Sequence, residues 1–166
     1  MSTRTKTGFK SRPADFSIGS YFVWASQGWS CLMRVDAPKG EKVSAVVVRS
    51  NGVVDFVPKP STSTRAIVDT AEATRLLERL AQRPVTVSDR DERLKSALRA
   101  QKALDPFVKV EVLLELALLR EQGEGFWSDD KVSYARLKEQ LVDEIAASLR
   151  LTVDAVESRF AAHGIP

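Results

Sequence analysis

The chain has 166 residues, of which 43% are hydrophobic and 28% are charged, and these values are typical of a soluble globular protein. Its single cysteine, Cys31, excludes an internal disulfide and indicates a reducing compartment, so we expect a cytoplasmic protein. No apolar run reaches the roughly 20 residues that cross a bilayer, and the first 16 residues lack the apolar core of a secretory signal, so no membrane partner is expected.

The charge is unevenly distributed along the chain. The formal net charge is +3, and residues 1–15 carry four basic residues against one aspartate, which also gives +3. Residues 16–166 are therefore neutral overall, and any basic surface there must be a local patch. Because residues 1–15 are polar and lack periodicity, we expect a disordered basic tail.

Residues 16–68 have the pattern of β-structure. Turn residues separate short β-branched and aromatic runs at 21–24, 29–36, 43–50, 53–58 and 65–68. Asn51-Gly52, between two apolar runs, is a strong hairpin signal. We expect a five-stranded small β barrel or strongly bent sheet, with a core filled by Trp24 and Trp29 and with Cys31 as a small buried hydrophobe.

From residue 69 onward the spacing of apolar residues becomes helical. Asp69 and Glu72 form a capping-box pattern, and a long apolar segment begins at Asp105-Pro106 and stops at Gly123. Further caps are expected at Ser88, Ser128 and Thr152. Residues 69–166 therefore predict an all-α bundle of about five helices, with 105–123 at its centre and Trp127 packed between helices. The fold class is α+β.

The residues that would carry enzyme chemistry are scarce. The only histidine, His163, lies near the C-terminus, and one histidine with one cysteine provides no zinc-site spacing. No glycine-rich phosphate loop is present, and most carboxylates have basic neighbours three or four residues away. We therefore expect a binding module with no enzyme activity, no cofactor and no metal ion.

The segment 93–102, RLKSALRAQK, contains four basic residues and no acid. Lys95, Arg99 and Lys102 lie within about 60° on a helical wheel, next to an apolar arc of Leu94, Ala97 and Leu98 that can pack. Such a stripe can follow nucleic-acid phosphates, but a solvated helix face has the same pattern. The candidate DNA-binding residues are Arg90, Arg93, Lys95, Arg99, Lys102, Arg136 and Lys138.

The order of the elements resembles the CarD/CdnL family of bacterial transcription regulators over residues 18–160. The N-terminal pattern of that family is matched by Gly19, Trp24, Gly28, Lys39-Gly40, Val57-Pro58 and 65–68, and LVDEIAASLRLTVDAVESRF is similar to its final helices. The resemblance implies a nucleoid-associated monomer. In it, a Tudor-like domain at 16–68 binds the RNA polymerase β subunit, and a helical domain at 69–166 contacts promoter DNA without sequence specificity, at the upstream edge of the bubble, and stabilises the open complex. The polymerase-binding candidates are Arg34, Pro38, Lys39, Val54 and Phe56.

Three departures from the family pattern leave an alternative open. The tryptophan that the family inserts into the minor groove has no counterpart in 83–94, which instead offers Val85 and Val87 and carries three acids. Phe56 precedes Val57-Pro58 with no arginine in VDAPKG, and Ala25 stands in place of the usual proline. The alternative is a protein-interaction adaptor that binds RNA polymerase or another partner without contacting DNA.

Overall fold

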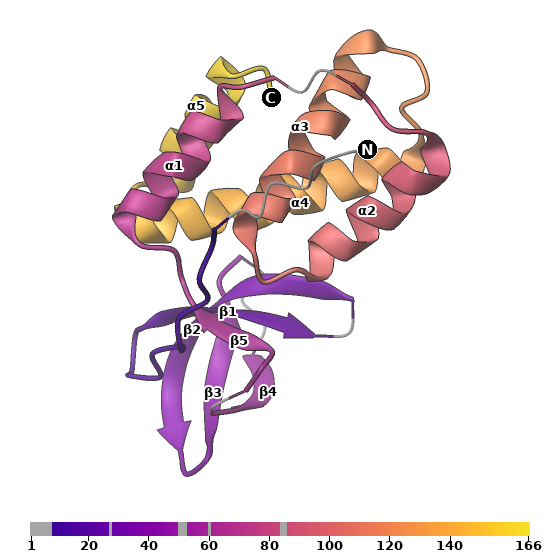
Figure 1. Ribbon diagram of the computed structural model, residues 1–166. Helices are drawn as coiled ribbons and strands as arrows, with labels where there is room; N and C mark the ends of the chain where they lie inside the picture. The colour runs from indigo at the N-terminus through magenta and orange to yellow at the C-terminus, as the bar shows by residue number, and fades with distance from the viewer. Residues whose placement is uncertain (1–7, 27, 50–52, 60, 84–85) are drawn as a thin grey trace.

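The computed structural model describes residues 8–26, 28–49, 53–59, 61–83 and 86–166, with the side chains of 53–55 excepted. Five antiparallel strands precede five helices (Figure 1), which confirms the α+β class. The strands are β1 (Tyr21–Ser26), β2 (Trp29–Lys39), β3 (Lys42–Val47), β4 (Val53–Pro58) and β5 (Thr64–Ala66). The helices are α1 (Thr70–Leu80), α2 (Arg90–Lys102), α3 (Pro106–Gln122), α4 (Ser128–Leu149) and α5 (Val153–Ala162).

The sheet is a curled half-barrel with the strand order β4-β3-β2-β1-β5. The 11-residue β2 is long enough to pair with β1 along its first part and with β3 along its second. The register shifts between Val35 and Ala37 and between Val43 and Ala45, and such bulges bend strands and increase their twist. Across the described residues, β4 and β5 are the two edges. The proposed Asn51-Gly52 hairpin turn lies outside the described residues.

The interior of the half-barrel is filled by phenylalanine and by aliphatic and sulfur-containing side chains rather than by tryptophan. Phe22, Met33 and Val43 are fully buried there, and Cys31 is also buried, as the sequence predicted. Trp24 is only half-buried and packs against this cluster, while Trp29 is 41% exposed. The core prediction is therefore wrong for Trp29. The physical reason is its position in the last pair of the β1–β2 ladder, where the sheet ends and no facing strand covers it.

Several helix boundaries follow the capping patterns of the sequence. The reciprocal Asp69–Glu72 capping box is present, Pro106 opens α3, and Gly123 ends it with a left-handed φ of 77°. Thr152 caps α5 by accepting a hydrogen bond from the Ala155 N–H. These four boundaries are confirmed.

For two other helices the predicted N-cap differs from the observed one by a single residue. The N-cap of α2 is Asp89 rather than Ser88, because the Ser88 hydroxyl donates to the Glu115 carboxylate instead. Helix α4 begins at Ser128, so its N-cap is Trp127, and the Asp130 carboxylate accepts from the Trp127 N–H at 3.0 Å.

The helical core lies between α3 and α4. Leu113 and Leu116 from α3 meet Leu137, Leu141 and Ile145 from α4, and all five side chains are fully buried. Helix α3 is buried on most sides, as expected, yet α4 is the helix that contacts all four others and β2 as well. None of the helices that the structure describes is both long and apolar enough to cross a membrane.

The described part of the N-terminal segment, residues 8–15, is docked rather than disordered. The Arg12 side chain donates to the Glu72 carboxylate at 2.8 Å and to the Ile67 carbonyl at 3.0 Å, and its own carbonyl accepts from the Ala66 N–H. Phe9 packs against the helical core. The prediction of a disordered tail is wrong for these residues, because Phe9 and Arg12 both have specific long-range partners.

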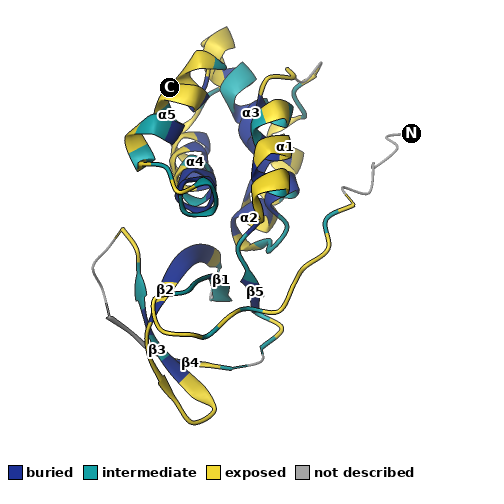
Figure 2. Ribbon diagram, turned by 90° about the vertical axis from the view of Figure 1, so that its left-hand side faces the viewer, coloured by how far each residue is buried: buried dark blue, intermediate teal, exposed yellow. Residues whose placement is uncertain are grey.

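The two modules meet along buried polar contacts, and the half-barrel lies beneath the helical bundle (Figures 1 and 2). Arg65 on β5 is fully buried and forms a bidentate ion pair with Glu144 on α4. The buried ammonium of Lys109 on α3 donates to the Ser30 hydroxyl on β2. The chain changes from strands to helices near residue 69, and these buried contacts join the half-barrel to the helical bundle across that boundary.

Candidate nucleic-acid interface

Three basic side chains form an exposed stripe along α2. Lys95, Arg99 and Lys102 are all exposed, and the opposite side of the helix is buried against α3 and α4. At about 100° per residue the three lie within about 60° of one another, so they share one face. We call these three residues the α2 stripe. The sequence predicted that these three residues share one helix face, and the structure places that face at the surface.

The charges of the α2 stripe are not compensated by ion pairs. Among the described residues, no ion pair joins any of the three to an acid, whereas some other arginines are paired, such as Arg79 with Glu111 at 2.6 Å. At a rise of about 1.5 Å per residue, Lys95 and Lys102 lie about 10 Å apart along the axis. This length spans about three phosphates of one DNA strand, which follow one another at about 3.4 Å along the duplex axis.

The first turn of α2 is acidic. Asp91 and Glu92 lie there and are both exposed, and Asp89 caps the helix through the Glu92 N–H. Carboxylates in this position stabilise the positive end of the helix dipole, but they repel phosphates. A phosphate-binding surface on α2 is therefore restricted to the part from Lys95 onward.

The packing side of α2 is rotated from the sequence-based expectation. Leu98 is 57% exposed, and the buried arc consists of Arg93, Ala97, Ala100 and the neighbouring Gln101. The Arg93 Nε donates to the Asp130 carboxylate at 3.0 Å, and only 4% of the residue is exposed. The assignment of Arg93 to DNA is thus wrong, because it is a buried structural arginine. Arg93, Ala97 and Ala100 stand at i, i+4 and i+7, a spacing that is typical of the buried face of a helix. The leucines suggested a different face.

Arg90 and Trp127 meet at the N-terminal ends of α2 and α4. Trp127 is 56% exposed, and the Arg90 guanidinium carbon lies 5.5 Å from the centre of its ring, within cation–π range. The prediction that Trp127 packs between helices is wrong. As the N-cap residue of α4 it precedes the first helical turn, so its side chain lies outside the apolar stripe of that helix.

Of the two basic candidates on α4, only Arg136 lies beside α2. Arg136 is exposed and donates to the Gln101 side-chain oxygen at 3.3 Å. Lys138 follows two residues later, which turns it about 200° around the helix, and it is half-buried. The structure therefore brings Arg136 together with α2 and separates Lys138 from it.

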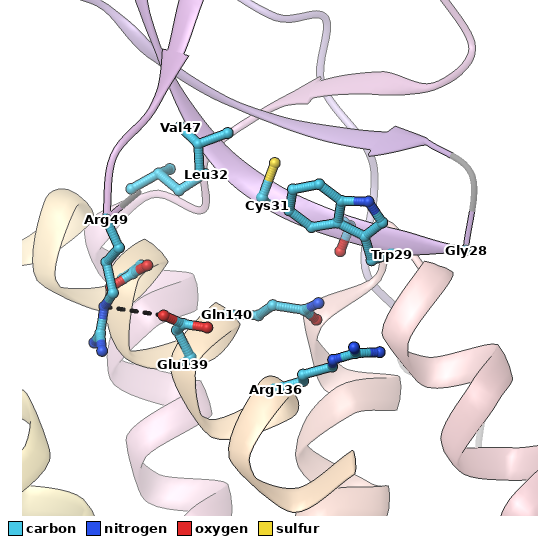
Figure 3. Close-up of a pocket in the computed structure, with 11 residues that line it drawn as sticks. Gly28, Trp29, Cys31, Leu32, Val47, Arg49, Arg136, Glu139 and Gln140 are labelled. Atoms are coloured by element: carbon cyan, nitrogen blue, oxygen red, sulfur yellow. Dashed lines mark hydrogen bonds and ion pairs between the residues drawn. The ribbon is translucent and has the colours of Figure 1, made fainter. Parts of the chain in front are cut away.

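A pocket of about 490 Å³ opens between the half-barrel and α4 (Figure 3). Trp29 from β2 lies on one side, and Arg136 and Gln140 reach from α4 on the other. At a third side, Arg49 donates to the Asp143 carboxylate at 2.5 Å and lies 3.8 Å from that of Glu139. No sequence pattern indicated this pocket, because its walls come from segments about 100 residues apart.

Three buried ionisable groups lie in or next to the wall of the pocket: Cys31 and Asp143 line it, and Lys109 contacts the lining residue Gln140. The Lys109 ammonium donates to the Gln140 side-chain oxygen at 2.8 Å, and burial lowers the pKa of Lys109 to about 7. Burial raises the pKa of Asp143 to about 6, although its bond with Arg49 acts in the opposite direction. Burial also raises the pKa of the Cys31 thiol to about 12, so Cys31 is protonated at neutral pH and is a poor nucleophile.

The polymerase-binding candidates lie on the half-barrel, and two of them come together. Phe56 is 47% exposed, and the Lys39 ammonium lies 5.5 Å from the centre of its ring, near the exposed end of the β2–β3 hairpin (Figure 2). Pro38 is exposed beside Lys39, and Arg34 is exposed with its guanidinium 3.6 Å from Asp36. The side chain of Val54 lies outside the described residues.

The described part of the chain contains no group of three or more histidine, cysteine or acidic side chains arranged to hold a metal ion. His163 is half-buried at the C-terminal cap of α5.

No protein-family model matches this chain, and no curated protein matches it.

Proposed function

We propose that this chain is a bacterial transcription regulator that binds DNA through the α2 stripe and RNA polymerase through the half-barrel, and thereby stabilises the open promoter complex. The observation that carries the proposal is the exposure of Lys95, Arg99 and Lys102 without acidic partners. The proposed binding to RNA polymerase rests on the resemblance of the element order to the CarD/CdnL family. The proposals that the protein is a monomer and acts at the nucleoid in the cytoplasm rest on the same resemblance.

The α2 stripe supports binding to the phosphate backbone rather than reading of bases. Lysine and arginine that neutralise phosphates release condensed counterions, which makes affinity fall steeply with salt. Such contacts position a protein on DNA without specifying the sequence. Arg136 extends the same basic surface onto α4, whereas Arg90 lies in the acidic first turn of α2, contacts Trp127 and is separate from the stripe. We therefore expect binding that depends on salt and little on sequence.

The half-barrel offers two features suited to a protein partner. Its β4 edge leaves backbone groups that can pair with a strand of another chain. Phe56 and Lys39 add an exposed apolar ring and a positive charge close to that edge. Aromatic groups of this kind gain binding energy when a partner buries them.

Two assays with the full chain test the proposal. Fluorescence anisotropy with a duplex promoter fragment at several salt concentrations should show binding that weakens as salt rises. Immobilised protein should also capture purified RNA polymerase, and the Phe56→Ala variant should capture less.

The alternative function is a protein-interaction adaptor that does not touch DNA. It is favoured by the acidic first turn of α2 and by the exposed apolar side chains of Leu98 and Trp127, which suit a protein surface. Polymerase capture without any salt-dependent DNA binding, by the chain alone or in complex with polymerase, would support the adaptor and refute DNA binding.

A further inference from the structure

The α2 stripe leads directly to the mouth of the pocket between the modules. Gly28 lines the pocket, and a Cβ built on it would lie 3.5 Å from the Lys102 side-chain carbon Cε. Lys102 is the last residue of the stripe and of α2. A nucleic-acid strand whose phosphates follow the stripe would therefore arrive with its next nucleotide at this opening.

The walls nearest to Lys102 present two flat groups. The Trp29 indole comes from β2, and the Arg136 guanidinium comes from α4 on the opposite side (Figure 3). Nucleobases stack on tryptophan rings and on guanidinium planes, and this stacking is the main source of affinity for unpaired bases. The Arg136 guanidinium is oriented by its hydrogen bond to Gln101, and the backbone of Trp29 is held by its pairing with Ser26.

The charges of the pocket separate a base from its phosphate. The carboxylates of Glu139 and Asp143 lie on the side away from α2, where Arg49 pairs with them. These acids disfavour a phosphate inside the pocket but tolerate an uncharged ring, so the phosphates remain on the side of the stripe. The volume of about 490 Å³ falls within the range of about 300–1,000 Å³ of small-molecule sites and exceeds what one base requires.

We propose that this pocket holds one unpaired nucleobase, stacked between Trp29 and Arg136, of a strand whose phosphates bind the α2 stripe. The proposal rests on the proposed function and deepens it, because it makes single-stranded or partly melted DNA the preferred ligand. It also assigns a role to the exposure of Trp29, which the core of the half-barrel does not use.

The test compares a fluorescein-labelled single-stranded oligonucleotide with the duplex of the same sequence, by anisotropy at one salt concentration. Loss of a base–aromatic stack costs about 1–3 kcal/mol, so Trp29→Leu should weaken single-strand binding by roughly 5- to 150-fold and leave duplex binding unchanged. Trp29→Phe retains an aromatic face and should restore most of the affinity. Ile18→Ala, which truncates a 72% exposed apolar side chain outside the pocket lining, is the control and should bind as the unmodified chain does.

A second measurement does not depend on the labelled ligand. Unlabelled single-stranded DNA should quench the tryptophan fluorescence of the unmodified chain, and Trp29→Phe should remove most of that quenching. If both forms of DNA bind with salt dependence but Trp29→Leu binds the single strand as tightly as the unmodified chain, the base pocket is refuted and the proposed function stands. If neither form of DNA binds the unmodified chain, the proposed function itself fails.

Discussion

Replacing Glu144 by leucine should destabilise the whole chain, because it leaves a buried guanidinium without its counter-charge. Arg65 has no exposed surface, and Glu144 is 3% exposed. The Glu144 carboxylate binds both terminal nitrogens of Arg65, at 2.9 Å for one of them, and it also accepts from the Val68 N–H at 2.9 Å. After the substitution the partners of Arg65 that remain among the described residues are the carbonyl oxygens of Ala66 and Leu104 and the Phe9 ring, whose centre lies 5.2 Å from the guanidinium carbon, and none of them carries a negative charge.

The expected loss follows from two costs. Breaking a buried ion pair by removing one partner costs about 3–5 kcal/mol, and leaving a buried N–H without an acceptor costs about 1–3 kcal/mol. Since domains of this size are stable by about 5–15 kcal/mol in total, Glu144→Leu should lower the free energy of unfolding by at least about 3 kcal/mol. Urea unfolding followed by circular dichroism measures this difference.

A more exposed bidentate arginine–glutamate pair is the control. Glu111 also binds its arginine, Arg79, through two contacts, at 2.7 and 2.6 Å, but the Glu111 side chain is 49% exposed. Glu111→Leu should therefore cost less than about 1 kcal/mol. The double variant Arg65→Met/Glu144→Leu should be more stable than Glu144→Leu alone, because no unpaired charge remains. Equal, small losses for Glu144→Leu and Glu111→Leu would refute the reasoning.

Three further outcomes are expected. Trp127→Ala should change the free energy of unfolding by less than about 1 kcal/mol, because the indole is 56% exposed, and a loss of 3 kcal/mol or more in the same urea assay would show that it packs in the core. Because burial lowers the pKa of Lys109 from 10.5 to about 7, the folded chain binds fewer protons than the unfolded chain above pH 7. The free energy of unfolding should then rise between pH 7 and 9, by at most about 1.4 kcal/mol per pH unit, and Lys109→Met should abolish this rise. The pH window ends at 9 because the raised pKa of Cys31 lowers the free energy of unfolding as the pH rises above 9.0. Phe56→Ala should weaken capture of RNA polymerase with little effect on stability, since Phe56 is 47% exposed, and unchanged capture would remove Phe56 from the polymerase-binding surface.

The features that local chemistry determines were predictable from the sequence. The Asp69–Glu72 box, Pro106 and Gly123 each act within one helical turn, so their patterns specify the helix ends directly. The aromatic and apolar run between turn residues likewise predicted the strand β2, although its last three residues were missed because Pro38 and Gly40 suggested an earlier turn. The α2 stripe belongs to this class, since it depends only on the helical period.

The errors concern residues whose environment is set by partners distant in the sequence. Arg93 looks like a surface cation until Asp130, 37 residues away, is packed against it. Arg12 belongs to a segment without periodicity, yet it finds Glu72, 60 residues away. Similarly, Trp29 shares a pocket with Arg136 only because α4 crosses the end of β2. No pattern within a short window carries that information.

The salt dependence of DNA binding by a stripe variant tests the central claim most directly. The variant replaces Lys95, Arg99 and Lys102 together by glutamine, which keeps helix propensity and most of each side-chain stem. Each lost phosphate contact removes about 0.9 from the slope of log affinity against log salt, so the slope measured by anisotropy on a duplex promoter fragment should become shallower by roughly 2–3. The control Arg150→Gln/Arg159→Gln, which removes two exposed charges at the end of α4 and on α5, should keep the slope of the unmodified chain. An unchanged slope in the stripe variant, or no salt-dependent binding by the unmodified chain, would contradict the account.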